Sequence, residues 1–148
     1  IKTKIEESMF SNSYDKIFSK VRVIVYEGKV LLVGTVESSD TKEKAENISW
    51  KIKNVKEVAN YISLGQNDLV DYVKDTRISL EFRAKLLTDQ EISEVNFSST
   101  TENRVLYIVG IAQDSNEINK IKDHASNIAG VVKIINLIID KNDPTRKN

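Results

Sequence analysis

Hydrophobic and polar residues along this chain follow a cycle that changes from a period of two to a helical period and back. Residues 21–25 form a β-branched run with period two, Gly28 lies in a polar break, and residues 30–36 are again apolar. Period-two segments joined by a glycine-containing turn predict a β-hairpin. Ser38, Ser39 and Asp40 then offer side-chain oxygens that can cap a helix.

The residues after this cap change to helical spacing. Ala45, Ile48 and Ile52 recur on one face, which predicts a helix that ends at Asn54. Residues 55–64 are again rich in apolar and β-branched side chains and predict a closing strand. A strand–helix–strand connection of this length favours parallel pairing of the two strands it joins.

The same cycle returns later in the chain. Setting Gly34 on Gly110 gives an offset of 110 − 34 = 76 residues, and this offset also pairs Asn60 with Asn136 without a gap. Register held over a strand, a helix and a strand indicates duplication of a supersecondary unit. The second copy predicts strands over residues 95–101, 104–112 and 131–139 and a helix over residues 115–129.

An apolar helical segment precedes each hairpin, with Ile5 and Met9 in the first copy and Phe82 in the second. The pattern therefore predicts an α+β fold of two tandem αββαβ modules, each a small three-stranded sheet covered by helices in a sandwich-like arrangement. We expect the first module at residues 1–66 and the second at residues 67–142. Residues 143–148 have nothing to bury and are predicted to be disordered.

Composition removes several classes of function. The 22 Lys and Arg residues balance the 22 Asp and Glu residues, so no long-range field attracts nucleic acid. The absence of Cys excludes disulfides, thiolate catalysis and zinc–thiolate sites. The apolar runs are shorter than the roughly 20 residues that a transmembrane helix needs. Neither a G-x-G-x-x-G motif nor a P-loop is present, and the carboxylates fall on polar faces or caps, so we expect no catalysis, cofactor or metal.

The hairpin carries a specific motif. Residues 28–36 spell G-x-V-x-L-x-G-x-V, which resembles the hairpin signature of the BON-domain family, named for bacterial osmotically inducible and nodulation proteins. The crossover segment of residues 45–58 is similar to the family pattern A-x-x-I-A-x-x-V-x-G-V-x-x-V. Two such modules cover nearly the whole chain. The sequence departs from the pattern at Arg104, where Asn103 can supply a left-handed turn residue, and at Asn54, which replaces a glycine.

Four glycines are predicted to have structural roles. Gly28 belongs to the first hairpin turn, and Gly130 suits the end of the second crossover helix. Gly34 and Gly110 lie inside strands, where a backbone without a side chain is expected to let the crossover helix approach the sheet.

The resemblance implies a periplasmic, outer-membrane-associated protein, often exported as a lipoprotein, that belongs to envelope integrity and stress response. Modules of this family are expected to bind phospholipid surfaces, and no catalysis is implied. The alternative is a protein-interaction or scaffold module of the periplasm. The chain opens with Ile1 and not with Met, as expected if an export signal has been removed.

The helix before the second hairpin is apolar on two faces. Ile78, Phe82 and Leu86 share one stripe, while Leu80 and Leu87 fall near the opposite side. One stripe can cover its own sheet, and the other is left for the first module, a partner or lipid. Basic side chains nearby can meet the phosphates of anionic phospholipid. The candidate lipid- or partner-binding residues are Tyr72, Lys74, Arg77, Leu80, Arg83, Ala84, Lys85 and Trp50.

Two residues are ambiguous from sequence alone. Trp50 lies off the buried stripe of the first crossover helix, so it is either exposed or packed at an interface. His124, the single histidine, occupies the position that Ile48 fills in the first copy, and this predicts a half-buried core histidine on the sheet-facing side of its helix.

Overall fold

The structure is a computed structural model that describes residues 1–11 and 15–146. The chain divides into two compact units, Ile1–Asn67 and Asp68–Asn148. The first unit contains α1 (Lys2–Phe10), α2 (Asp15–Phe18), β1 (Val21–Tyr26), β2 (Lys29–Val36), α3 (Ser39–Trp50) and β3 (Glu57–Leu64). The second unit contains α4 (Leu69–Thr88), η1 (Glu94–Asn96), β4 (Phe97–Glu102), β5 (Val105–Ala112), α5 (Ser115–Ser126), β6 (Lys133–Asp140) and η2 (Pro144–Arg146).

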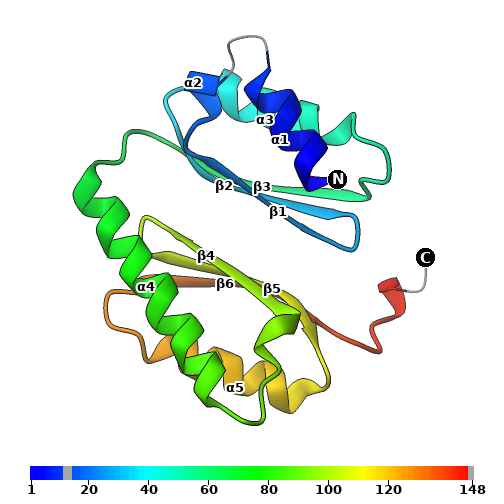
Figure 1. Cartoon of the computed structure of the whole chain (residues 1–148), viewed down its shortest axis with the longest axis vertical. Helices are drawn as coiled ribbons and strands as arrows, with labels where there is room; N and C mark the ends of the chain where they lie inside the picture. Colours follow the sequence, from blue (N-terminus) through cyan, green and yellow to red (C-terminus); the bar gives the residue numbers. More distant parts are fainter. Residues whose placement is uncertain (12–14, 147–148) are drawn as a thin grey trace. The chain divides into compact units, whose positions relative to one another are not determined.

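Each unit is built around one three-stranded sheet, with the strand order β1-β2-β3 or β4-β5-β6. The central strand pairs antiparallel with the preceding strand of the hairpin and parallel with the strand that follows the crossover helix. Helices α1, α2 and α3 cover one face of the first sheet, and α4 and α5 cover one face of the second (Figure 1). The predicted α+β class and the predicted parallel pairing after each crossover are confirmed.

The sequence repeat is also a structural repeat. Gly34 lies opposite Ile62 in the first sheet, and Gly110 lies opposite Ile138 in the second. Both pairs differ by the same offset of 76 residues, because 110 − 34 and 138 − 62 are equal. The two sheets therefore share one register, and residues related by this offset occupy equivalent backbone positions.

Each unit has its own hydrophobic core between the sheet and its helices. Ile5 and Met9 of α1 and Phe18 of α2 are at most 1% exposed in the first unit. Ile78 and Phe82 of α4 are fully buried in the second. Burial of a side chain of this size contributes roughly 1.5–3 kcal/mol, so the helices are held mainly by these apolar stripes. Helix α2 was not expected from the sequence.

The strand glycines make room for the backbone of a neighbouring strand, so the prediction that they accommodate the crossover helix is wrong. A Cβ atom at Gly34 would lie 2.2 Å from the carbonyl oxygen of Lys20, just before β1. A Cβ atom at Gly110 would lie 2.3 Å from the carbonyl oxygen of Asn96, just before β4. The close approach is therefore between neighbouring strands inside the sheet, in both units.

Both hairpins turn through two residues with positive φ, as the mirror-image two-residue turns require. In the first unit these are Glu27 and Gly28, with φ of 44° and 82°. In the second they are Asn103 and Arg104, with φ of 51° and 62°. The predicted left-handed conformation of Asn103 is thus confirmed, although Arg104 adopts one as well.

A buried carboxylate supports the second turn. Asp75 of α4 is 4% exposed, and its two carboxylate oxygens accept hydrogen bonds from the backbone N–H groups of Asn103 at 2.9 Å and Arg104 at 2.8 Å. A carboxylate that accepts two backbone bonds is a strong local anchor. This contact connects helix α4 to a turn that lacks the glycine of the first hairpin.

Several predicted element ends were wrong. Helices α3 and α5 end at Trp50 and Ser126, earlier than the apolar periodicity predicts, and β3 and β6 begin two residues late. Gly130, with φ of 91°, therefore lies in the loop after α5 and not at the end of the helix, where Asn127 is the cap. In the predicted disordered tail, Pro144–Arg146 form a 3-10 turn, while residues 147–148 lie outside the described part.

The edge strands β3 and β6 carry the same side-chain contact. Asn60 accepts a hydrogen bond through Oδ1 from the N–H group of Ile62 at 3.2 Å, and Asn136 accepts one from Ile138 at 3.0 Å. In the first unit the Asn60 amide also donates to the carbonyl oxygen of Lys42 in α3 at 3.0 Å. These contacts explain why asparagine recurs at this position of the repeat.

Candidate functional site

Helix α4 carries seven of the eight residues that the sequence predicts as contacts for lipid or a partner. The helix begins after Asp68, whose Oδ1 atom accepts a hydrogen bond from the Asp71 N–H group at 2.9 Å. The Asp71 carboxylate in turn accepts a bond from the Asp68 N–H group at 3.5 Å, which completes a reciprocal capping box. This cap fixes the point at which the apolar first turn of α4 begins.

One side of α4 faces the core of the second unit. Ile78 and Phe82 are fully buried, and Leu86 is 2% exposed. The predicted inner stripe is confirmed, so the opposite side is the part of α4 that is available for other contacts.

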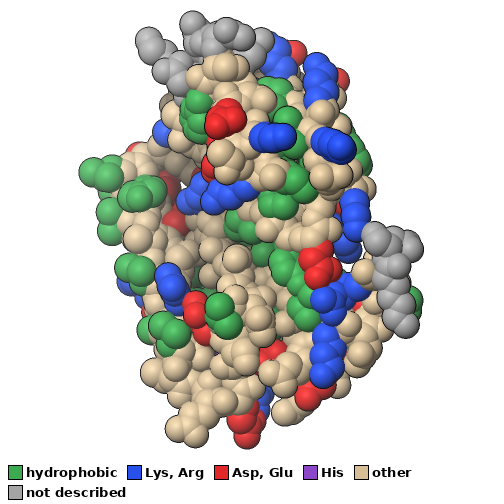
Figure 2. Space-filling model, turned by 45° about the vertical axis from the view of Figure 1, so that its right-hand side comes forward, with side chains coloured by type: hydrophobic (Ala, Val, Ile, Leu, Met, Phe, Trp, Pro, Cys, Tyr) green, Lys and Arg blue, Asp and Glu red, His purple; other side chains and the backbone are tan. Residues whose placement is uncertain are grey.

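The opposite side is apolar and exposed. Leu80 exposes 64% of its surface, Leu87 61% and Tyr72 59%, and Ala84 is exposed as well. Hydrophobic side chains stand out along the left edge of the molecule in Figure 2, where α4 lies. A contiguous exposed apolar surface of this kind marks a site of interaction.

The first turn of α4 adds three exposed apolar residues that were not predicted from the sequence. Leu69, Val70 and Val73 are 75%, 58% and 58% exposed. Leu69, Val73, Leu80 and Leu87 are separated by 4, 7 and 7 residues, so they share one stripe at about 100° per residue. The signal was present as an apolar run directly after the Asp68 cap. We call these four residues, together with Tyr72 and Ala84, the outer stripe of α4.

The four basic candidates on α4 differ in their surroundings. Arg77 Nη1 lies 2.8 Å from Glu81 Oε2, and Arg83 Nε lies 3.0 Å from Glu94 Oε1. Arg77 also donates to the carbonyl oxygen of Ala129. Among the described residues, no ion pair joins Lys74 or Lys85 to an acidic side chain. The two arginines lie about 60° to either side of the outer stripe, where long side chains can extend along an apolar surface.

Trp50, the eighth candidate, belongs to the first unit. It is the last residue of α3 and is 49% exposed, outside the core of its unit.

His124 is half-buried, as predicted, and its imidazole has a charged partner. Its Nε2 atom lies 2.8 Å from Asp89 Oδ2, at the end of α4. The hydrogen bond with His124 holds the pKa of Asp89 below its usual value, and the N–H group of Glu91 adds to this effect. Lys120 completes the cluster, and its contact with Glu91 raises the pKa of Lys120. The sequence could not reveal the contact between His124 and Asp89 because 35 residues separate them.

Cavities and metal-binding geometry add little to the site. In the first unit a pocket of about 450 Å³ lies near the start of α3, lined in part by Lys20, Ser38 and Thr41. In the second unit a hollow of about 360 Å³ is lined in part by Arg83 and Val95. No group of three His, Asp or Glu side chains within the described ranges is arranged to hold a metal ion. No helix in these ranges is both long and apolar enough to cross a bilayer.

The duplication of the module is also found when the chain is compared with known proteins. The sequence profile of the BON domain matches twice, at residues 1–66 and 74–139. An uncharacterized protein in the gshII 5′ region of Anaplasma centrale is 35% identical over 97% of this chain and 95% of its own length. The outer membrane lipoprotein DolP of Haemophilus influenzae is 27% identical over 89% of this chain and 68% of its own. The 21 kDa hemolysin of Actinobacillus pleuropneumoniae is 28% identical over 81% of this chain and 62% of its own length.

Similarity to solved structures is weaker. Two structures of CdsD, a structural protein of the type III secretion system of Chlamydia trachomatis, are similar to this chain. The first matches 85% of this chain and 61% of its own length, and the second matches 97% of this chain and 94% of its own length. Their sequence identities are 16% and 14%, and their TM-scores are 0.38 and 0.39.

Proposed function

Because this chain belongs to the BON-domain family, we propose that it is a non-catalytic binding protein of the bacterial envelope whose helix α4 contacts anionic phospholipid surfaces. The observation that carries the proposal is the outer stripe of α4, which leaves Leu80 and Leu87 more than half exposed on a helix whose inner side already fills a core. A helix that is apolar on its free side and basic at the margins is suited to lie along a membrane surface.

The charges around the outer stripe support an anionic partner. Lys74 and Lys85 have no acidic partner among the described residues, but at 100° per residue they lie about 120° and 140° from Leu80, nearer to the inner stripe. Arg77 and Arg83 are therefore the basic residues beside the outer stripe, and a basic residue near an anionic leaflet contributes roughly 1 kcal/mol. Arg77 and Arg83 flank the stripe, and their stems extend its apolar margin. Together these features favour contact with headgroups over insertion across the bilayer.

The proposed location is the periplasm, in association with the outer membrane, where the protein supports membrane integrity. Support comes from the similarity to a protein named as an outer membrane lipoprotein, over 89% of this chain. The uncharacterized relative from Anaplasma centrale matches most of this chain but adds no information on location.

Vesicle co-sedimentation tests the proposal. The chain is expected to sediment with vesicles of phosphatidylglycerol and phosphatidylcholine at low ionic strength, and much less with phosphatidylcholine alone or at high salt. Leu80→Ser combined with Leu87→Ser should weaken binding by at least about tenfold, because two leucine side chains lose their apolar contact. Val95→Ser is the matched control, since Val95 is 86% exposed in the same unit but lies outside α4.

The alternative is a scaffold that binds another protein through the same surface. The spacing of 7 residues from Val73 to Leu80 and from Leu80 to Leu87 also fits the seam of a partner helix. Binding to vesicles that the double substitution leaves unchanged would contradict the membrane assignment of α4. No sedimentation of the original chain with anionic vesicles would reject lipid binding and leave the scaffold function.

A further inference from the structure

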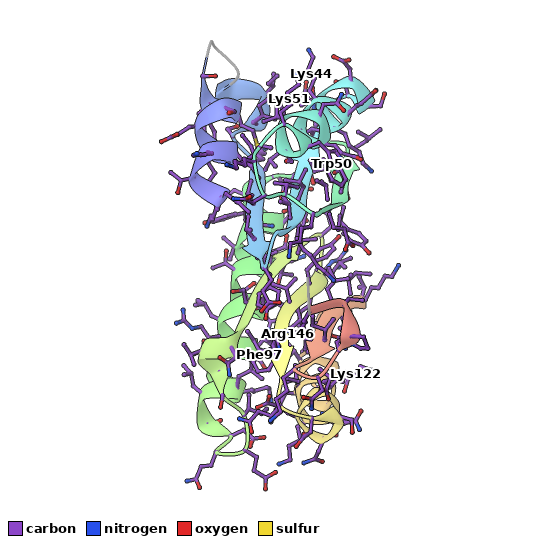
Figure 3. The ribbon with its side chains drawn as sticks, turned by 90° about the vertical axis from the view of Figure 1, so that its right-hand side faces the viewer. Lys44, Trp50, Lys51, Phe97, Lys122 and Arg146 are labelled. Atoms are coloured by element: carbon purple, nitrogen blue, oxygen red, sulfur yellow. The ribbon has the colours of Figure 1, made fainter. Side chains whose placement is uncertain are left out.

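The first unit has an exposed aromatic residue at the end of its crossover helix. Trp50 is 49% exposed, whereas Ala45 and Ser49 on the inner side of α3 are fully buried. Figure 3 shows Trp50 and Lys51 where the helix ends. The indole ring has an apolar body and one polar N–H group, and such a ring is favoured where an apolar phase meets water.

The loop after Trp50 is basic. Lys51, Lys53 and Lys56 lie within six residues, all three are exposed, and no acidic residue occurs between them. The next acidic residue, Glu57, has its carboxylate 3.7 Å from the ammonium group of Lys29. We call Trp50 and these three lysines the tryptophan–lysine surface.

The second unit provides an internal comparison. With the offset of 76, residues 50–56 correspond to residues 126–132, which contain neither a charged nor an aromatic side chain. The backbone is alike in both places, because Asn54 and Gly130 both have positive φ, 75° and 91°, and the strands that follow have equivalent register. The fold therefore tolerates an uncharged loop here, and the tryptophan and lysines are not needed to form it.

We infer that the tryptophan–lysine surface is a second docking surface for an anionic bilayer, in the first unit and separate from helix α4. The inference rests on the proposed function, because it names a further contact with the same kind of surface. Each lysine near an anionic leaflet strengthens binding by about fivefold, and the indole ring can enter the headgroup region. Two surfaces on one chain also gain from tethering, because the second contact becomes intramolecular once the first has formed.

A bilayer fits this surface better than a nucleic acid does. Single-stranded nucleic acid is held by a basic groove with several aromatic side chains on which successive bases stack. Here one aromatic residue stands beside three lysines. The first unit, counted over residues 1–66, carries 11 basic and 9 acidic residues, a net charge of 11 − 9 = +2. The positive charge is therefore local and suited to a planar anionic surface.

The chain contains a single tryptophan, so tryptophan emission, excited at a wavelength that tyrosine does not absorb, reports on Trp50 alone. On addition of vesicles of phosphatidylglycerol and phosphatidylcholine to the full chain, the emission is expected to shift to shorter wavelength and to become less accessible to acrylamide. Phosphatidylcholine vesicles should produce neither change. High salt should reverse the shift, because it screens the attraction between the lysines and the lipid phosphates.

A variant with residues of the second unit in place of the three lysines tests their contribution to lipid binding and keeps Trp50 as the fluorescent probe. Lys51→Asn, Lys53→Ala and Lys56→Val introduce the side chains that the equivalent loop already carries. The emission shift should disappear and co-sedimentation should weaken by at least about tenfold. The control removes the same charge elsewhere, with Lys4, Lys122 and Lys133 changed to Asn, and should keep the shift. Circular dichroism of both variants verifies that the fold is retained.

The possible outcomes separate the two proposals. Co-sedimentation of the original chain without any change at Trp50 would overturn the second docking surface and leave the role of α4 intact. Loss of the shift in the control variant as well would show a general charge effect and would also overturn it. Absence of co-sedimentation would reject the proposed function and this inference together. A shift with a short single-stranded oligonucleotide, but not with vesicles, would assign the surface to nucleic acid.

Discussion

Gly34 shows how a single position can be fixed by its neighbour's backbone. Its φ of 154° and the 2.2 Å distance from a Cβ atom to the Lys20 carbonyl oxygen leave no room for a side chain. We predict that Gly34→Ala lowers the free energy of unfolding by about 2–5 kcal/mol, since the conformation is strained and the strands must move apart. Urea denaturation of the purified variant measures the loss.

Gly65→Ala is the control for this prediction. Gly65 also has a positive φ, 143°, but the nearest atom to its Cβ position is Thr35 Cγ2 at 4.0 Å. Only backbone strain remains, so the expected loss is about 1–2 kcal/mol. Equal losses in the two variants would show that the contact with Lys20 does not matter.

Asp75 is the second residue whose role depends on contacts far along the chain. Asp75→Ala would leave the N–H groups of Asn103 and Arg104 without their acceptor, and we expect a loss of about 2–4 kcal/mol in unfolding free energy. Asp71→Ala, on an exposed part of the same helix, should change stability by no more than about 1 kcal/mol. Thermal unfolding followed by circular dichroism compares the two, and a similar small change in both would remove the anchoring role of Asp75.

At the scale of elements, the hairpins and closing strands were predicted to within about two residues at most ends, because period-two patterns and turn residues are local signals. Helix ends were less accurate. Ile52 and Ile128 continue the apolar periodicity after α3 and α5 have ended, and both still pack against their cores from loops. The hydrophobic pattern predicts which side chains face the core, but it does not show whether the backbone at those residues is still helical.

The edge strands lead to a prediction at the same scale. Asn136→Val removes the acceptor for the Ile138 N–H group, and we expect it to lower stability by about 1 kcal/mol although valine favours strands. An edge N–H group without its side-chain cap is also open to pairing with another chain, so self-association should increase. Light scattering and urea denaturation measure both effects, with Asn136→Asp as the control that keeps an acceptor. If the Asn136→Val variant stays monomeric and equally stable, this role of the asparagine is disproved.

At the scale of the whole molecule, the chain has two cores rather than one. Phe82 is fully buried in the second core, and Phe18 is fully buried in the first. We predict that Phe82→Ala, which should cost about 3–5 kcal/mol, speeds amide hydrogen exchange throughout the second unit and leaves β2 of the first unit protected. Leu80→Ala on the exposed side of α4 serves as the control and should leave exchange nearly unchanged. Equal loss of protection in both units would show that they unfold as one body.

The duplicated units, their order of strands and helices and the two-sided character of α4 were all readable from the amino-acid sequence, because repeats and hydrophobic periodicity are encoded by neighbouring residues. Three-dimensional packing was needed to show what the glycines accommodate, where His124 and Asp75 find their partners and that Trp50 is exposed. Each of these depends on groups that are far apart in the chain or on what stays uncovered after the cores have formed. Such contacts are set by packing, and a local pattern carries no information about them.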